Sequence, residues 1–355
     1  MKLRNMQTKA YAVGSAAALV ISMVALTPPA NAAGYVIGVS NAWAGNSWRE
    51  EMVCAIKAES TLSGKVASVV VASRTTDSAG QLADVRSLIS QGVNAIIVNA
   101  GDVNALTPAV DEAVEAGIKV VAVDNAITDK KATIVSNDQV AYGAVGAEAL
   151  AKAMNYKGNV LYMRGAAGAG ADTDRNTGFQ MVMKKYPKIK IAKTVFTNWD
   201  WATGGTMAKQ LLQPGKFQGV WTSGIDYPVV QAMTTKLHGK YIPLVGADNN
   251  EFVHQTITLA SKGFVGIIVG NPAVVGGAAA KVAIRLLDGK TVASPLLLHP
   301  VAWTMATNAK DIAAHYYPDQ AATFSSSTSI KGLTSFTASQ LFRCRAPQDD
   351  PETTG

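Results

Sequence analysis

The chain has 355 residues, of which 48% are hydrophobic and 16% charged, and its formal net charge is +7. This composition excludes an intrinsically disordered protein, and the length exceeds what one hydrophobic core usually fills, so we expect two domains. Lysine and arginine form no run that could build a nucleic-acid-binding stripe, so we expect no nucleic-acid partner.

The first 32 residues have the features of an export signal. Three basic residues precede any acid: Lys2, Arg4 and Lys9. Residues 10–26 are apolar and uncharged, and Ala30-Asn31-Ala32 fits the small-x-small cleavage pattern. We predict export to the periplasm with cleavage after Ala32, which leaves a mature net charge of about +4. The alternative is an uncleaved membrane anchor, for which this apolar run is at the short end.

Short β-branched runs alternate with helical stretches along the rest of the chain. In order, the runs are Tyr35–Val39, Val66–Val71, Ala95–Val98, Lys119–Val123, Val160–Met163, Ile189–Phe196, Val220–Thr222, Ile242–Val245 and Val265–Val269. They are nearly all apolar instead of alternating, which is typical of parallel strands buried on both faces. The sequence therefore predicts an α/β fold with parallel sheets.

Capping residues delimit two of the intervening helices. Leu82, Val85 and Leu88 fall on one helical face, and Gly92 ends that helix. Thr107-Pro108 fits an N-cap followed by proline at the first helical position, and Gly117 closes the second helix.

The C-terminal part holds one of the chain's two cysteines. Cys54 lies in an early helix and Cys344 near the end, and an oxidising periplasm permits a disulfide between them. Two separate buried thiols are the alternative, because sequence alone does not show that the two Cα atoms approach. We expect residues 316–318 and 325–329 to form a strap over the surface, residues 330–336 to add a small strand, and residues 348–355 to be disordered.

Polar and aromatic residues follow the predicted strands. They are Asn41, Trp43 and Trp48, Asn99, Asp124-Asn125, Arg164, the run Asn198-Trp199-Asp200-Trp201, Asp226, Asp248 and Asn271. Open α/β sheets bind ligands at the carboxyl ends of their strands. Amides, carboxylates and arginines hydrogen-bond hydroxyl groups, and indole faces stack on the C–H face of a sugar ring. These residue types predict a small ligand with many hydroxyls.

From Gly34 to about Thr307 the chain resembles the ribose/galactose-type periplasmic sugar-binding proteins of ABC importers, which have the type I periplasmic binding protein fold. The matching segments, in order, are IGVSNAWAGNSWREEM, LISQGVNAIIVNAGD, GIKVVAVDN, IVSNDQVAYG, RNTGF, TNWDWATGG, GIDYPVVQAM, LVGADN and GNPAVVGG. Their order and spacing are specific, although each segment alone is weak.

The resemblance implies two Rossmann-like lobes with parallel sheets, joined by a three-strand hinge. We expect one lobe from residues 34–137 plus 271–305, a second lobe and strap from 138–270 plus 306–340, and a tail at 341–355. The hinge is expected near residues 136–140, 270–274 and 304–307. Ligand would bridge the lobes, and the closed monomer would deliver it to an ABC transporter permease.

The resemblance also implies a set of ligand contacts. By position they fall on Asn41, Trp48, Asp124, Arg175, Trp199, Asp200 and Asp248, and Arg49 matches the branch that resembles galactofuranose-type binders. From the residues themselves we add Trp43, Asp172, Asp226 and Asn271. The acids could instead cap helices, Arg175 could pair with Asp172 or Asp174 at the surface, and the tryptophans could belong to the core.

Departures from the family pattern bear on the ligand. Asn125 stands where many relatives have arginine, Ile225-Asp226 where many have Asn-Asp, and Gly270 where many have glutamine. Trp43 and Trp201 are extra aromatic residues. Fewer donors and more aromatic surface favour a polyol, a deoxy sugar or a furanose over a plain ribose or glucose.

Other functions fit less well. The four histidines are scattered and there is no cysteine cluster, so we expect no metal and no cofactor. Residues 165–170 lack the spacing of a dinucleotide-binding loop, and no nucleophile elbow is present, so we expect no enzyme. A repressor of the same fold would need an N-terminal helix-turn-helix. A periplasmic sensor that presents its closed form to a chemoreceptor or sensor kinase remains the alternative function.

Overall fold

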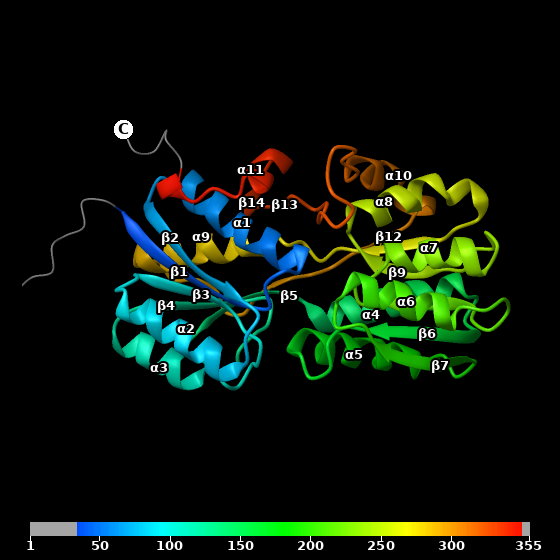
Figure 1. Ribbon diagram of the computed structural model, residues 1–355, viewed down its shortest axis with the longest axis horizontal. Coiled ribbons are helices and arrows are strands. Elements are labelled where there is room, and N and C mark those ends of the chain that lie inside the picture. Colours follow the sequence, from blue (N-terminus) through cyan, green and yellow to red (C-terminus); the bar gives the residue numbers. More distant parts are fainter. Residues whose placement is uncertain (1–33, 350–355) are drawn as a thin grey trace, which may run out of the picture. The chain divides into compact units, whose positions relative to one another are not determined.

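A computed structural model of the chain describes residues 34–349 (Figure 1). The predicted export signal and its cleavage after Ala32 lie outside the described residues. Among residues 34–349, no helix has the length and apolar character needed to cross a membrane.

The first sheet has six strands in the order β11-β5-β4-β3-β1-β2, and every neighbouring pair is parallel. In chain order these strands are β1 (Tyr35–Ala42), β2 (Val66–Arg74), β3 (Ala95–Asn99), β4 (Lys119–Val123), β5 (Thr133–Asn137) and β11 (Leu296–Leu298). Helices α1 (Ser47–Leu62) and α9 (Val275–Leu287) cover one face, and α2 (Ser78–Ser90) and α3 (Thr107–Glu115) cover the other (Figure 1).

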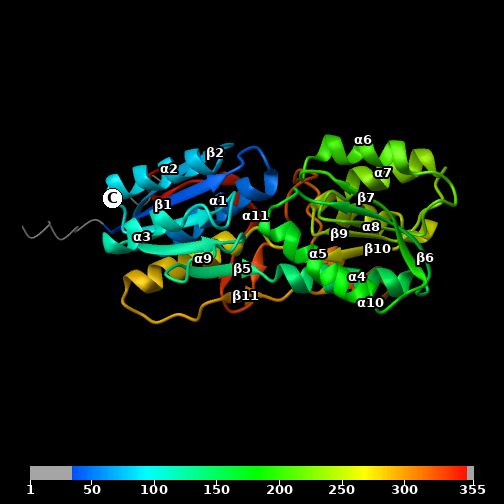
Figure 2. The same cartoon turned by 90° about the horizontal axis from the view of Figure 1, so that it is seen from below.

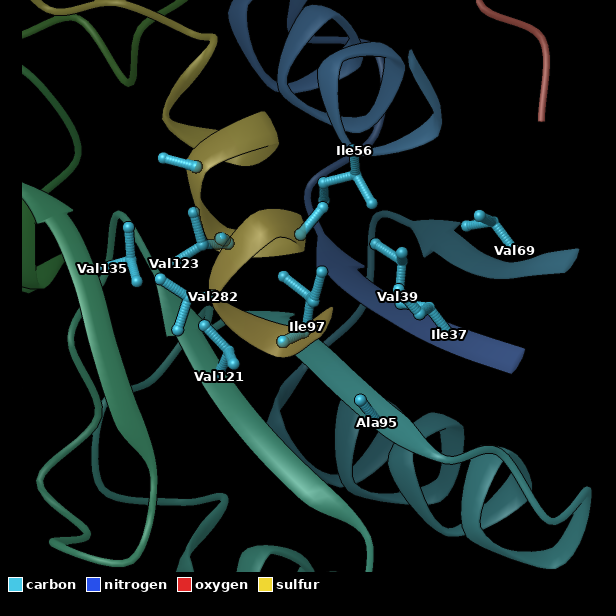
Figure 3. Packing of buried hydrophobic residues seen from close by; sticks show 14 of the residues in the cluster. Ile37, Val39, Ile56, Val69, Ala95, Ile97, Val121, Val123, Val135 and Val282 are labelled. Atoms are coloured by element: carbon cyan, nitrogen blue, oxygen red, sulfur yellow. The ribbon is translucent and has the colours of Figure 1, made fainter. Parts of the chain in front are cut away.

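The core on the α1 and α9 side of this sheet is made of β-branched side chains. Figure 3 shows Ile56 of α1 and Val282 of α9 among strand residues such as Ile37, Ile97 and Val121. Ile37, Ile56, Ile97 and Val121 have no exposed surface. Burying each such side chain stabilises the fold by roughly 1.5–3 kcal/mol, which explains why the strands are apolar on consecutive residues.

The second sheet also has six strands, in the order β12-β10-β9-β8-β6-β7, and only β12 is antiparallel to its neighbour. They are β6 (Gly158–Arg164), β7 (Ile189–Phe196), β8 (Gly219–Thr222), β9 (Leu244–Ala247), β10 (Gly266–Val269) and β12 (Ala302–Trp303). Helices α4 (Gln139–Ala153) and α5 (Gly170–Met183) cover one face. Helices α6 (Trp201–Leu211), α7 (Tyr227–Lys236), α8 (Asn250–Thr258) and α10 (Met305–Ala314) cover the other, and Figure 2 shows the two sheets from a second direction. The predicted α/β fold is confirmed.

The chain passes between the two sheets at three points before residue 304. It leaves the first sheet after β5, returns between β10 and α9, and leaves again between β11 and β12. The first two points coincide with the expected segments 136–140 and 270–274. The third lies at residues 299–301 instead of 304–307, because Ala302 and Trp303 already pair with β10. The lobe boundaries given from the sequence remain a prediction.

The C-terminal strap, residues 315–349, makes a fourth passage, back to the first sheet. Its hairpin β13 (Ser329–Ile330) and β14 (Thr334–Ser335) and its helix α11 (Ala338–Arg343) precede the short helix η2 (Pro347–Asp349). The α11 helix packs on α1, and Cys344 is bonded to Cys54 with their Cα atoms 4.4 Å apart. The predicted disulfide is therefore confirmed.

Hydrogen bonds anchor the strap to elements of both sheets. Ser325 and Ser326 are buried, and the Ser325 N–H donates to Glu51 of α1 and the Ser326 N–H to the Asp248 carbonyl. Disorder was expected from residue 348, yet the Gln348 amide exchanges two hydrogen bonds with the backbone of Val69 in β2. The disulfide holds this segment against the sheet, and residues 350–355 lie outside the described part.

Replacing both Cys54 and Cys344 by alanine is expected to lower the free energy of unfolding by about 2–5 kcal/mol, because the disulfide closes a very long loop. Urea unfolding followed by tryptophan fluorescence measures the loss. Amide hydrogens of residues 338–349 should also exchange faster in the variant. Wild-type protein kept reduced is the control and should match the variant. An unchanged unfolding midpoint in both would contradict the expectation.

Candidate functional site

The loop after β1 fixes a buried arginine. Asn46 caps α1 by accepting a hydrogen bond from the Arg49 N–H. Arg49 Nη1 donates to Asn41 Oδ1 at 2.8 Å and to the Ala42 carbonyl at 2.9 Å, and its guanidinium lies 4.7 Å from the Trp43 ring centroid. Burial lowers the pKa of Arg49 to about 10, and the charge of Asp124 opposes that fall. The side chain therefore carries its positive charge at neutral pH.

Asp124 follows β4 and faces this arginine. Its backbone has φ of 61°, a left-handed conformation that is uncommon for any residue but glycine. Its Oδ1 accepts from Gln139 Nε2 at 2.8 Å. Burial raises the pKa of the carboxyl group, while the charges of Arg49 and Arg175 lower it.

Arg175 reaches the same place from α5 of the second sheet. Its Nε donates to Gln139 Oε1 at 2.7 Å, and its Nη1 donates to the Ser223 carbonyl and hydroxyl oxygens at 2.9 and 3.0 Å. The guanidinium lies 4.1 Å from the ring centroid of Tyr142. Gln139 therefore joins Asp124, from the first sheet, to Arg175, from the second.

The indole of Trp199 lies on the side of the site that is next to the second sheet. Trp199 lies in the loop between β7 and α6 with φ of 53°, and its Nε1 donates to the Ser223 carbonyl at 3.0 Å. A Cβ at Gly165 would come within 2.2 Å of the Trp199 ring, so only glycine allows this close approach. Next to it, Trp201 lies against Tyr227 with ring centroids 4.9 Å apart.

These side chains surround one cavity, which we call the inner cavity. It encloses about 600 Å³ of non-atom space, part of it open to solvent. Its lining residues come from loops of both sheets: Asn46, Trp48, Arg49, Asp124, Asn125, Ala171, Arg175, Trp199, Trp201, Ser223, Gly224, Ile225, Ala247, Asn249 and Asn271. Concave sites lined by aromatic side chains and a few fixed polar groups are typical of small-molecule binding.

A second cavity, the outer cavity, has about 970 Å³ of non-atom space, including open solvent. Its lining residues are Trp43, Ala44, Gly45, Asn46, Arg49, Thr75, Ala166, Asn198, Trp199, Asp200 and Trp201. Most of these residues do not line the inner cavity, but Asn46, Arg49, Trp199 and Trp201 line both cavities.

Hydrogen bonds connect the loops of the two sheets around the cavities. Trp48 Nε1 donates to the Asn271 carbonyl at 2.7 Å, and the Ala171 N–H donates to Asn125 Oδ1 at 3.1 Å. Asn46 Nδ2 donates to the Trp199 carbonyl at 3.4 Å.

Six residues predicted as ligand contacts line the inner cavity: Trp48, Arg49, Asp124, Arg175, Trp199 and Asn271. Two others, Trp43 and Asp200, line the outer cavity. Asp200 also caps α6, because its Oδ1 accepts from the Thr203 N–H at 2.7 Å.

The remaining four predicted residues lie in neither lining. Asn41 holds Arg49, as described above. Asp172 pairs with Arg164 at 2.6 Å, not with Arg175. Asp226 accepts from the N–H groups of Tyr227 and Ala247 and from Asn249 Nδ2. Asp248 accepts from the Asn271 N–H at 3.0 Å. Direct ligand contact by these four residues remains a prediction.

The sequence interpretation left out several lining residues. Trp201 and Asn125 were noted there but not chosen as contacts. Ser223 and Asn249 follow β8 and β9, so the rule that ligands bind after strands could have found them. Ala171 and Ala247 have no polar side chain, and no sequence signal marks them. Among the described residues, no group of three or more His, Cys, Asp or Glu side chains could hold a metal ion.

Two such sheets, with a cavity between their loops that aromatic and charged side chains line, form the two-lobed architecture of a binding protein. Residues 37–291 match the model of the periplasmic binding protein domain family, so the chain belongs to that family. It is a family of sugar-binding periplasmic proteins of ABC transporters, as the sequence resemblance indicated.

Curated relatives agree with this assignment. The chain is 26% identical to the ribose import binding protein RbsB of Bacillus subtilis over 74% of this chain and 87% of the relative. It is 31% identical to a xylitol-binding protein of Mycolicibacterium smegmatis over 62% of this chain and 64% of the relative. Among solved structures, the arabinose ABC transporter component of Shewanella bound to L-arabinofuranose matches with a TM-score of 0.69 and 25% identity, over 78% of this chain and 94% of that one.

Asp226→Asn is expected to lower the free energy of unfolding by about 1–3 kcal/mol. The NH₂ group of asparagine would face at least one of the three N–H groups that now donate to the carboxylate, and two donors cannot form a hydrogen bond. Urea unfolding measures it, with Asp319→Asn, an exposed acid in the strap, as the control. Unchanged stability combined with lost ligand binding would contradict the structural role and favour direct contact.

Proposed function

We propose that the chain is a periplasmic solute-binding protein that captures a small sugar or polyol in the inner cavity and delivers it to an ABC import permease. The observation that carries the proposal is the convergence of two arginines, one carboxylate and three indoles on one cavity between the sheets. A polyol, a deoxy sugar or a furanose suits this balance of donors and aromatic surface.

The charged groups have hydrogen-bonding capacity left for hydroxyl groups. Arg49 bonds the protein through Nη1, and Arg175 through Nε and Nη1, so each has Nη2 to donate to a ligand. Asp124 accepts from Gln139 at Oδ1, and a carboxylate has about four acceptor sites in all. A ligand that lacks the matching hydroxyl would leave one of these buried groups unpaired, which gives the site its selectivity.

The positions of these groups suggest how binding is coupled to closure. Arg49 in α1 and Asp124 after β4 lie beside the first sheet. Arg175 in α5 and Trp199 before α6 lie beside the second. A ligand that contacts both sets stabilises the arrangement in which the loops meet, so bound and unbound proteins present different surfaces to a permease.

We also propose that the protein catalyses no reaction on its ligand. Hydrolysis of a glycosidic bond ordinarily uses two carboxyl groups, one on each side of the bond. Among the described residues, Asp124 is the only acid in the lining of the inner cavity.

Names of relatives support the ligand class. They include a ribose import protein, a xylitol-binding protein and a structure with bound L-arabinofuranose. A pentose furanose and a five-carbon polyol are similar in size and number of hydroxyls, and we carry that common chemistry to this chain.

A thermal-shift screen of the purified mature protein tests the proposal, with xylitol, myo-inositol, D-ribose, L-arabinose and D-galactose. At least one compound is expected to raise the melting temperature by several degrees, since a ligand that binds only the folded state stabilises it by mass action. No shift with any compound at saturating concentration would contradict the proposal.

Asp124→Ala is expected to weaken binding of the compound so identified by about 10- to 100-fold, because a hydrogen bond to a charged group contributes about 1.5–3 kcal/mol. Isothermal titration calorimetry measures the change, with Asp319→Ala, the same substitution at an exposed acid, as the matched control. Wild-type affinity in the Asp124 variant would exclude this carboxylate as a contact.

Affinity is also expected to fall in acid. The ionised carboxylate is the stronger acceptor for ligand hydroxyls, since protonation turns one of its oxygens into a donor, and burial raises the pKa of Asp124 above its ordinary value. Binding is therefore tightest above that raised pKa and weakens as the pH falls through it. Titrations at several pH values check this, and the residual binding of Asp124→Ala should lack the same loss.

A further inference from the structure

We propose that the outer cavity is a second subsite, which holds the second ring of a two-ring glycoside whose first unit occupies the inner cavity. This inference rests on the proposed function. It assigns the ligand to a narrower class: a polyhydroxylated unit joined to a second ring that offers a flat or C–H face.

The two cavities share part of their walls. Asn46, Arg49, Trp199 and Trp201 line both of them. In the proposed arrangement, the bond between the two rings of the ligand lies beside these four side chains. The outer cavity has the larger non-atom volume, about 970 Å³ including open solvent, against about 600 Å³.

Aromatic surface dominates the outer cavity. Three indoles line it, from Trp43, Trp199 and Trp201. The rings of Trp43 and Trp199, from opposite sheets, have centroids 6.4 Å apart and planes inclined at 43°. Indole faces stack on sugar rings and on flat bases alike.

Both loops that carry these indoles are held in uncommon backbone conformations. Trp43 has φ of 72°, Asn198 of 54° and Trp199 of 53°. Backbone hydrogen bonds fix them, since the Trp43 N–H donates to the Arg74 carbonyl and the Asn198 N–H to the Gly165 carbonyl. Strain of this kind persists only where the surroundings fix it, and it gathers at ligand sites. The loops that line the outer cavity are therefore held in a fixed conformation, as is usual at ligand sites.

The charges of the outer cavity balance. Arg49 is the one cation and Asp200 the one anion among its described lining residues. Hydrogen bonds from Thr203 lower the pKa of Asp200, so its carboxylate stays ionised and can accept from a hydroxyl. Arg49 donates to Asn41 and Ala42 and lies against Trp43. This balance favours an uncharged second ring.

An uncharged ring with a stacking face is available from two sources, a second sugar or a nucleobase. The experiment therefore compares matched single-ring and two-ring probes by calorimetry: L-arabinose with arabinobiose, D-galactose with melibiose, myo-inositol with galactinol, and D-ribose with adenosine. The first three pairs report a second sugar, and the last reports a base. In at least one pair, the two-ring compound is expected to bind roughly tenfold more tightly, as expected for one added aromatic contact.

Ala166→Phe tests the location, because Ala166 lines only the outer cavity and a phenyl ring would fill it. The variant is expected to remove the advantage of the two-ring compound and to leave the affinity for the single-ring compound within about twofold. Ala192→Phe, an exposed position on β7, makes the same substitution outside both linings and is the control. In a second test, Trp43→Ala should reduce the ratio of the two affinities and Trp43→Tyr should restore it.

Each outcome decides the proposal. Single-ring compounds that bind as tightly as their two-ring partners in every pair would overturn the second subsite and leave the proposed function intact. Equal weakening of both members of a pair by Ala166→Phe would also overturn it. Absence of binding by every probe to the wild-type protein would overturn the proposed function and this inference together.

Discussion

The amide of Gln139 is the contact on which the site depends. Its nitrogen donates to Asp124, from the first sheet, and its oxygen accepts from Arg175, from the second. Both charged groups are buried, and a buried charge is stable only with a partner and hydrogen bonds. Gln139, a neutral side chain at the start of α4, therefore holds the two opposite charges at a fixed distance from each other. The cavity then keeps a fixed arrangement of donors and acceptors for a ligand.

Much of the fold could be predicted from sequence because burial on both faces leaves a strong pattern. The nine apolar runs all correspond to strands, and Trp221, within the run Val220–Thr222, is 1% exposed. The strands that were not predicted are short or weakly apolar. β5 ends in Ser136-Asn137, and β11 has three residues. They form strands because they pair with neighbouring strands, and their own sequence gives little indication of a strand.

Prediction of the site was less complete, for a related reason. Strand-end polar residues were easy to find, but sequence does not show which of them face the cavity and which support it. Asp226 and Asp124 both end up buried after strands, yet Asp226 meets three protein donors and Asp124 faces two arginines. Gln139 and Ser223 have no motif of their own, and both bond Arg175, which lies 36 and 48 residues away in sequence.

The disulfide has a consequence that concerns the integrity of the chain. Cys54 and Cys344 are 290 residues apart, so they close most of the described chain into one covalent ring that contains all four passages between the sheets. A protease that cuts any loop inside this ring produces two pieces that stay joined through sulfur. In an oxidising compartment, a single nick therefore opens the ring without releasing either sheet, and the two halves of the cavity stay attached to each other.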